Sequence, residues 1–343
     1  MIGKAVVLTL IVLLIGAVAW ADDYSDLIGR ADDKAAAGEY EEALELYLTA
    51  LKSDDAYHGD YYNAVCAAAL SGNADAAFAL LEEVVGSGLF DREMLEDDSD
   101  LESLRSDEQW EALLEALDEN REAIIAALPE THAEEPAIDL PDPQTAGDTS
   151  VEEALSTRRS VRAYADIPLT IDEISQLLWA AYGITYPVDE GPAFLRGGLR
   201  TAPSAGARYP LELYLVARNV DGVPAGVYRY RSETHQLITV VDGDRWEELS
   251  DAGFQQSHFG TAAAAVVFSA VFERNTDVYG KRGRERYVCM DLGHSAENLY
   301  LQAQVLKIGT CAIGAFGDLA LRKAVNMTRA EEPLYIMPLG KVE

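Results

Sequence analysis

Four polar donors stand within five positions at residues 158–162, and their chemistry suits a bound anion. Arg158, Arg159 and Arg162 carry guanidinium forks, and Ser160 adds a hydroxyl. Each fork can donate two parallel hydrogen bonds, which matches the oxygens of a phosphate group. The same residues on a surface helix would equally be solvated charge. The stretch alone therefore indicates a candidate phosphate cradle.

A second unusual stretch, RTAPSAGARYP at residues 200–210, has few large side chains and is followed by a β-run at 211–217. Ser204, Ala205 and Gly206 lie between its two prolines. One interpretation is a connecting loop, since proline and glycine punctuate loops. The other is a surface where bare backbone lies against a large flat ligand, because small residues permit close approach.

Regular elements are predicted around both stretches. Ser150 and Glu153 have the spacing of a capping box for a short helix that leads into the arginines. PLTIDEI (168–174) predicts the start of an amphipathic helix, and residues 291–309 predict a long central one. His294 on the long helix is interpreted as structural, because we find no acid partner placed near it.

Several other sites are not supported by the sequence. The histidines show no HxxH or HExxH spacing, so no metal site is predicted. No GxGxxG follows a predicted strand, which argues against a nicotinamide Rossmann site. The glycine-rich GTCAIGAFG lacks the GK[ST] ending of a phosphate loop.

Five ordered blocks in residues 150–343 resemble the nitroreductase-like flavoproteins, and the SagB-type dehydrogenases most of all. They are STRRSVRAYADIPLTIDEISQLLWAAYGIT, RTAPSAGARYPLELYLVA, GVYRYRSETHQL, the run from FERNTDVYG to LKIGT, and AIGAFGDLALRKAV with EEPLYIMPLGK. The resemblance implies an α+β FMN-binding domain that forms a homodimer with the flavin at the subunit interface. It also implies an oxidoreductase that passes a hydride through flavin N5.

The resemblance assigns roles to individual residues. Phosphate and ribityl contacts are implied for Arg158, Arg159, Ser160 and Arg162. Ser204, Ala205 and Gly206 match the loop beside the flavin. The remaining matches are Gly314 and Ala315, whose backbone would lie near the N5 edge, and Lys341, a basic residue that would reach the phosphate.

Two departures from the family pattern bear on the chemistry. Ala207 and Tyr209 stand where many nitroreductases have Asn and Gln, so those contacts to the flavin are absent or different. Azoline oxidases of the SagB-type branch carry a Lys-Tyr pair, whereas this chain has Val278 and Tyr279. Because valine cannot move a proton, we expect no azoline oxidation. Tyr279 is equally a candidate acid or hydrogen-bond donor and a candidate packing residue.

The charge is concentrated in the first half of the chain. Residues 22–150 hold 35 acidic and 6 basic residues, and residues 151–343 hold 24 and 20, within a total net charge of −32. Such acidity argues against nucleic acid or an anionic membrane surface as a partner. We expect an anionic ligand to bind only in the second half, where acidic and basic residues are nearly balanced.

The first half also shows an internal repeat. Gly38 and Gly72 are separated by 34 residues, and so are Ala43 and Ala77, which is the period of tetratricopeptide repeats. We expect an all-α tetratricopeptide-like domain over residues 22–128, closed by a capping helical segment at 100–117. The alternative is a generic amphipathic helical hairpin. A repeat domain would dock a peptide or protein partner, or act as a spacer.

The ends of this domain carry two further predictions. Residues 1–21, with Lys4, an apolar run and alanines before a cleavage point after Ala21, resemble a secretory signal, and an uncleaved anchor helix is the alternative. Export, or attachment to a membrane through this segment, is therefore expected. Residues 129–149 are rich in proline and acids and predict a mobile linker.

Together these features predict an exported, FMN-dependent oxidoreductase with a helical docking domain. The alternative is a non-catalytic module that keeps the flavin fold as a scaffold for a protein partner.

Overall fold

The computed structural model describes residues 24–53 and 56–342, and its internal contacts divide the chain into two units. The first unit extends to Gly86 and includes Arg92–Leu117, and the second comprises Ser87–Asp91 and Asp118–Glu343. The predicted signal segment lies outside the described residues. Among the described helices, none has the length and apolar character needed to cross a membrane.

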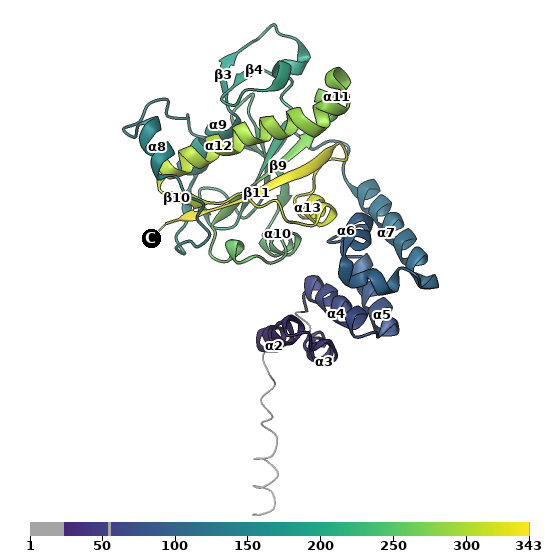
Figure 1. The fold of residues 1–343 in the computed structure, drawn as a ribbon. Helices are drawn as coiled ribbons and strands as arrows, with labels where there is room; N and C mark the ends of the chain where they lie inside the picture. The colour runs from purple at the N-terminus through teal and green to yellow at the C-terminus, as the bar shows by residue number, and fades with distance from the viewer. Residues whose placement is uncertain (1–23, 54–55, 343) are drawn as a thin grey trace, which may run out of the picture. The chain divides into compact units, whose positions relative to one another are not determined.

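The first unit is entirely helical (Figure 1). Its elements are α2 (Tyr24–Ala36), α3 (Tyr40–Ala50), α4 (His58–Leu70), α5 (Ala74–Val85), α6 (Arg92–Asp97), the 3-10 helix η1 (Ser99–Leu104) and α7 (Glu108–Ala127), whose residues from Asp118 onward belong to the second unit.

The expected 34-residue spacing recurs in the geometry of the first unit. The helix pair α4–α5 begins 34 residues after the pair α2–α3, and Gly38 and Gly72 occupy the turns within the two pairs with φ of 76° and 80°. Positive φ favours glycine, because a Cβ would clash with the backbone there. Ala43 and Ala77 are both fully buried, which lets neighbouring helices approach closely.

The second unit is built on a seven-stranded antiparallel sheet, which confirms the α+β prediction. Its strand order is β1-β8-β7-β5-β9-β11-β10. The strands are β1 (Ala137–Asp139), β5 (Leu211–Ala217), β7 (Gly226–Arg231), β8 (Gln236–Asp242), β9 (Ala264–Val271), β10 (Ile308–Thr310) and β11 (Glu331–Lys341). Two small sheets pair β2 (Leu169–Thr170) with β6 (Val220–Asp221), and β3 (Ile184–Pro187) with β4 (Gly198–Arg200).

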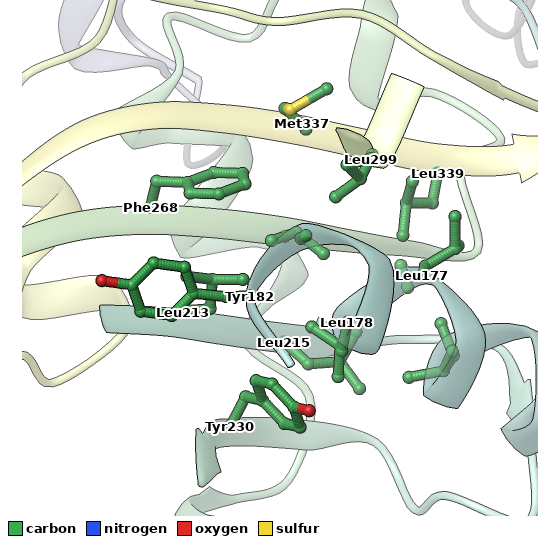
Figure 2. Packing of buried hydrophobic residues seen from close by; sticks show 14 of the residues in the cluster. Leu177, Leu178, Tyr182, Leu213, Leu215, Tyr230, Phe268, Leu299, Met337 and Leu339 are labelled. Carbon is green, nitrogen blue, oxygen red and sulfur yellow. The ribbon is translucent and has the colours of Figure 1, made fainter. Parts of the chain in front are cut away.

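Helices cover both faces of this sheet (Figure 1). They are α8 (Val151–Thr157), α9 (Ile171–Tyr182), α10 (Trp246–Ala252), α11 (Glu273–Tyr279), α12 (Cys289–Leu306) and α13 (Asp318–Ala324). Along β5, Leu213 and Leu215 face a core formed with α9 and α12, as Figure 2 shows, whereas Tyr214 and Val216 face a second core with α10 and α13. Alternate residues of β5 thus pack into hydrophobic cores on opposite faces of the sheet, which explains the continuous apolar run of this strand.

The sequence-based linker prediction for residues 129–149 is wrong in part, because this segment packs on the second unit. Residues Ala137–Asp139 form the edge strand β1, paired with β8. Gln144 donates its N–H to Gln176 of α9 at 2.8 Å. Flanking prolines are compatible with an edge strand, whose outer side needs no ladder partner. High proline content therefore does not keep residues 137–139 out of the sheet.

A buried ion-pair network supports the start of β5. The Glu212 carboxylate is 2.7 Å from Arg196 and 2.7 Å from Arg274, and Arg229 lies 3.9 Å away. Burial opposes ionisation of Glu212, but these three guanidinium groups together hold the pKa of its carboxyl at about 2. Arg196 and Arg274 also donate to the Tyr209 carbonyl, which ties the network to residues 200–210.

Candidate functional site

Residues 203–210, here called the small-residue loop, connect β4 to β5 and contain the short turn η3 (Ala205–Ala207). Three of these residues have positive φ: Gly206 at 60°, Ala207 at 56° and Tyr209 at 46°. Residues other than glycine adopt this region at a cost. The loop therefore depends on contacts from outside to keep its shape.

One such contact comes from Asp291 in the first turn of α12. Its carboxylate accepts hydrogen bonds from the Ser204 hydroxyl at 2.6 Å and from the Ala205 N–H at 3.2 Å. Asp291 is 3% exposed. This burial raises the pKa of its carboxyl above the ordinary value, although the two hydrogen bonds act in the opposite direction. The predicted ligand contacts Ser204 and Ala205 are thus anchored to α12.

Tyr279, the candidate acid, is the last residue of α11 and lies over the same loop. A Cβ added to Gly206 would overlap the Tyr279 hydroxyl oxygen and would be 3.4 Å from its Cζ. The Tyr279 ring packs edge-on against Tyr287, with centroids 5.0 Å apart. The structure thus places the candidate acid directly beside a predicted ligand-contact glycine. The neighbouring Val278 is 53% exposed.

Residues 158–162, here called the arginine segment, begin where α8 ends and contact α12 further along that helix. Arg158 lies over the Tyr300 ring, 5.1 Å from its centroid, and its Nε is 3.8 Å from Glu297. The Ser160 and Tyr300 hydroxyl oxygens are 3.4 Å apart. Tyr300 also accepts a hydrogen bond from the Ala312 N–H at 2.6 Å. Tyr300 therefore connects Arg158 and Ser160 to the loop after β10.

Arg159 and Arg162 keep their charges available to a ligand. Arg159 donates only to main-chain carbonyls of residues 156 and 158, and no carboxylate in the described residues pairs with Arg162. Both side chains are exposed. Unpaired, exposed guanidinium groups of this kind are what a phosphate group would require.

The segment that precedes β9 connects Arg162 with the loop of Gly314 and Ala315. Burial lowers the pKa of His258, and the nearby charge of Arg162 lowers it further. The Gln256 side chain donates to the Ala315 carbonyl at 2.9 Å. Gly314 and Ala315 are exposed. The sequence analysis singled out neither Gln256 nor His258.

Lys341 lies beside the arginine segment, but its ammonium group is paired. The carbonyl of Lys341 accepts a hydrogen bond from the Ala165 N–H at 2.9 Å, which places it beside residues 158–165. Its Nζ is bonded to the Glu173 carboxylate of α9. A phosphate contact from Lys341 would have to share its charge with Glu173.

Helix α12 joins the two groups of predicted residues. Asp291 holds the small-residue loop, and Tyr300 contacts Arg158 and Ser160. Between them the helix rises roughly 13 Å, at about 1.5 Å per residue. The arrangement suits an elongated ligand with a flat end over bare backbone and an anionic end at the arginines. No group of three or more possible metal-ligating side chains occurs in the described residues.

Asp291 and Tyr300 of α12, which build the site, are not among the residues predicted from the sequence. Asp291 stands three positions before His294. His294 itself is exposed, and its Nδ1 lies 3.3 Å from the Pro203 carbonyl. The sequence does carry a pattern that points to Asp291. This acid recurs at helical spacing with Leu292, Ser295 and Leu299, which form the buried face of the helix.

Comparisons with known proteins agree with this architecture. A sequence model of the nitroreductase family matches residues 155–341. A nitroreductase-like protein of Methanocaldococcus jannaschii is 43% identical over 204 residues, which cover 60% of this chain and 96% of that protein. The crystal structure of a nitroreductase-like protein from Ralstonia eutropha JMP134 has a TM-score of 0.52 and 28% identity, covering 63% of this chain and 94% of that one.

Two further similarities concern parts of the chain. The trifolitoxin-processing protein TfxB of Rhizobium leguminosarum bv. trifolii is 31% identical over 111 residues, which span 31% of this chain and only 30% of TfxB. Residues 23–125 match a model described as the N-terminal domain of A/B hydrolase-like proteins. The tetratricopeptide assignment accordingly stays a prediction. For the second unit, the family match spans every strand of the seven-stranded sheet except β1, together with α12 and both groups of site residues, and the chain belongs to the nitroreductase family.

Proposed function

We propose that this chain is an FMN-dependent oxidoreductase of the SagB-type branch. The observation that carries the proposal is the arrangement along α12, with the small-residue loop held near one end and the arginine segment near the other. Both groups of residues occur in one unit, and together they suit a ligand that is flat at one end and anionic at the other.

The side chains present fit this cofactor. Arg159 and Arg162 offer guanidinium groups for its phosphate, with Ser160 beside them. Ser204, Ala205 and Gly206 themselves carry only small side chains or none. Arg158 and Lys341 already have acidic partners, so we assign them supporting contacts.

Bound FMN would supply hydride chemistry at its N5 atom. The chain's own part is to bind and orient the cofactor and to exclude water where the small-residue loop, α11 and the loop of Gly314 meet it. Tyr279 is placed to hold or donate a proton at its hydroxyl oxygen. Val278 offers no group for proton transfer. We therefore propose reductase or dehydrogenase activity without azoline oxidation.

Other parts of the proposal concern assembly and location. Val151 and Leu155 of α8 are 65% and 55% exposed, and Met290 of α12 is 51% exposed. Exposed apolar side chains of this size support self-association, and we propose a homodimer through this unit. The partial similarity to TfxB, a trifolitoxin-processing protein, supports a peptide or protein partner. Docking of that partner on the helical unit is our proposal from the sequence. Export, or anchoring by residues 1–21, remains our proposal from the sequence.

A non-catalytic flavin-fold scaffold is the second candidate, favoured by Val278 in place of a proton-transferring lysine. Turnover assays separate the two. Protein loaded with FMN should be tested with nicotinamide donors, quinones, nitroaromatics and azoline peptides, following the visible band of the flavin. Reduction by a donor and reoxidation by an acceptor are expected, with azoline peptides unchanged. Inertness toward all donors would favour the scaffold, and rapid azoline turnover would refute our assignment of Val278.

A further inference from the structure

A buried acid on α12 has no described role in the chemistry proposed above. Asp291 lies among Leu292, Ser295 and Ala296 on the covered face of the helix. Burying a carboxylate costs free energy unless it is paired or well hydrogen-bonded. No lysine or arginine of the described residues forms an ion pair with Asp291. Its compensation comes from the small-residue loop.

The hydrogen bonds of Asp291 hold the start of the loop directly and its end through Ser204. One carboxylate oxygen accepts from the Ser204 hydroxyl and the other from the Ala205 N–H. The Ser204 oxygen in turn accepts the Tyr209 N–H at 2.9 Å. A chain of hydrogen bonds thus runs from the helix through Ser204 to Tyr209. It closes across Gly206 and Ala207, two of the residues with positive φ.

This chain of hydrogen bonds also determines where Gly206 lies beneath Tyr279. Gly206 is the next residue after Ala205, and Tyr279 comes from a different helix, α11. A shift of the loop would change the space between Gly206 and the Tyr279 hydroxyl, which is already too narrow for one carbon atom. The position of Asp291 therefore controls the geometry of the candidate cofactor surface.

We infer that Asp291 is a positioning residue that acts through Ser204 and Ala205 to hold the small-residue loop in its cofactor-binding shape. The inference rests on the proposed function for its link to FMN. Asp291 itself touches no reacting atom. Charge-assisted hydrogen bonds to a buried carboxylate are stronger than neutral ones, so the carboxylate cannot be replaced by its amide without loss.

The test uses three variants: Asp291→Asn, Ser204→Ala and the double variant that combines these two. Each is compared with the control variant Ser295→Ala. Ser295 is a matched control, because its hydroxyl makes a buried 2.7 Å hydrogen bond from the same helix to the Ala181 carbonyl, away from the loop. Readouts are the FMN dissociation constant, the visible spectrum of bound FMN and the unfolding midpoint in urea. Hydrogen exchange at the Ala205 and Tyr209 amides is measured without FMN.

We expect Asp291→Asn and Ser204→Ala each to weaken FMN binding about tenfold and to alter the bound-flavin spectrum. The double variant should bind FMN no more weakly than the single variant with the lower affinity, because both substitutions remove the same chain of hydrogen bonds. Ser295→Ala should lower the urea midpoint yet leave FMN affinity within about twofold. Unchanged affinity in Asp291→Asn, or an equal loss in Ser295→Ala, would overturn the inference.

The exchange measurement separates this inference from the proposed function. If the wild type fails to bind FMN, the proposed function fails, but faster exchange at Ala205 and Tyr209 in Asp291→Asn still supports the role of Asp291. Unchanged exchange at both amides would overturn it, whether or not FMN binds.

Discussion

The hydroxyl group of Tyr279 occupies the space in which Gly206 would carry a Cβ. These two residues come from α11 and from the loop before β5, far apart in the sequence. Their approach places a phenol hydroxyl next to bare backbone in the candidate cofactor site. It explains why a glycine stands at position 206 and leads to a two-residue test.

Gly206→Ala should abolish or severely weaken FMN binding. The new methyl group would overlap the Tyr279 oxygen, and alanine is strained at φ 60°. Gly206→Ala combined with Tyr279→Phe should recover part of the affinity, because the nearest remaining ring atom would lie 3.4 Å away. Fluorescence titration with FMN measures both. Equal FMN affinities in Gly206→Ala and in the double variant would contradict the contact between residue 206 and the Tyr279 hydroxyl.

Arg162→Ala should weaken FMN binding at least about tenfold, since a charge-assisted hydrogen bond contributes about 1.5–3 kcal/mol. Riboflavin, which lacks the phosphate, should bind both proteins equally. Arg245→Ala is the control, because Arg245 is partly exposed and, within the described residues, forms its ion pair with Glu248 three positions later, at 2.6 Å. A parallel loss of riboflavin affinity would show that Arg162 acts elsewhere than at the phosphate.

Tyr279→Phe alone should slow turnover while leaving FMN affinity unchanged. The substitution deletes the hydroxyl but keeps the ring that packs against Tyr287. Loss of a group that donates a proton in the transition state typically costs about 10²–10⁴ in rate. Single-turnover reoxidation of reduced enzyme is the measurement. Undiminished rates would identify Tyr279 as a packing residue.

Glu212→Gln should lower the free energy of unfolding by about 3–5 kcal/mol at neutral pH, because three guanidinium groups lose a buried carboxylate. The folded-state pKa of Glu212 is lowered from 4.5 to about 2. Its contribution is therefore complete above pH 4.5 and is lost as the pH falls toward 2. Urea unfolding should show the two proteins converging in acid. A constant difference down to pH 2 would contradict this.

Residues near 129 should resist proteolysis in the wild type and become susceptible in the Arg329→Ala variant. The Arg329 side chain donates to the carbonyls of Ala126 at 2.6 Å and Leu128 at 3.0 Å, both within the second unit. Arg329→Ala should expose this stretch to limited digestion, with cleavage mapped by mass spectrometry. Rapid cleavage there in the wild type would restore the mobile-linker prediction.

Local patterns predicted the elements well. The helix start predicted from PLTIDEI is observed at the start of α9, where Thr170 and Glu173 form a capping box, and the long helix expected at 291–309 is observed as Cys289–Leu306. These features depend on residues three or four positions apart, which the sequence places together. The order of the family blocks similarly predicted the α+β fold.

Contacts between distant segments were harder to predict. The pairing of Lys341 with Glu173 joins two elements whose proximity only the folded sheet creates. Pairing of β1 with β8 depends on residues about a hundred positions apart and overrides the proline-rich composition. The bond from Ser204 to Asp291 is likewise non-local. Candidate residues could thus be chosen from sequence, but not their partners.

The visible absorption spectrum of the purified protein shows whether the chain binds FMN. The account predicts a yellow protein with a flavin band, and release of FMN on denaturation, or uptake of about one FMN per chain when apoprotein is titrated. Colourless protein that takes up no FMN in titration would contradict the assignment of residues 158–162 and 203–210 as a cofactor site.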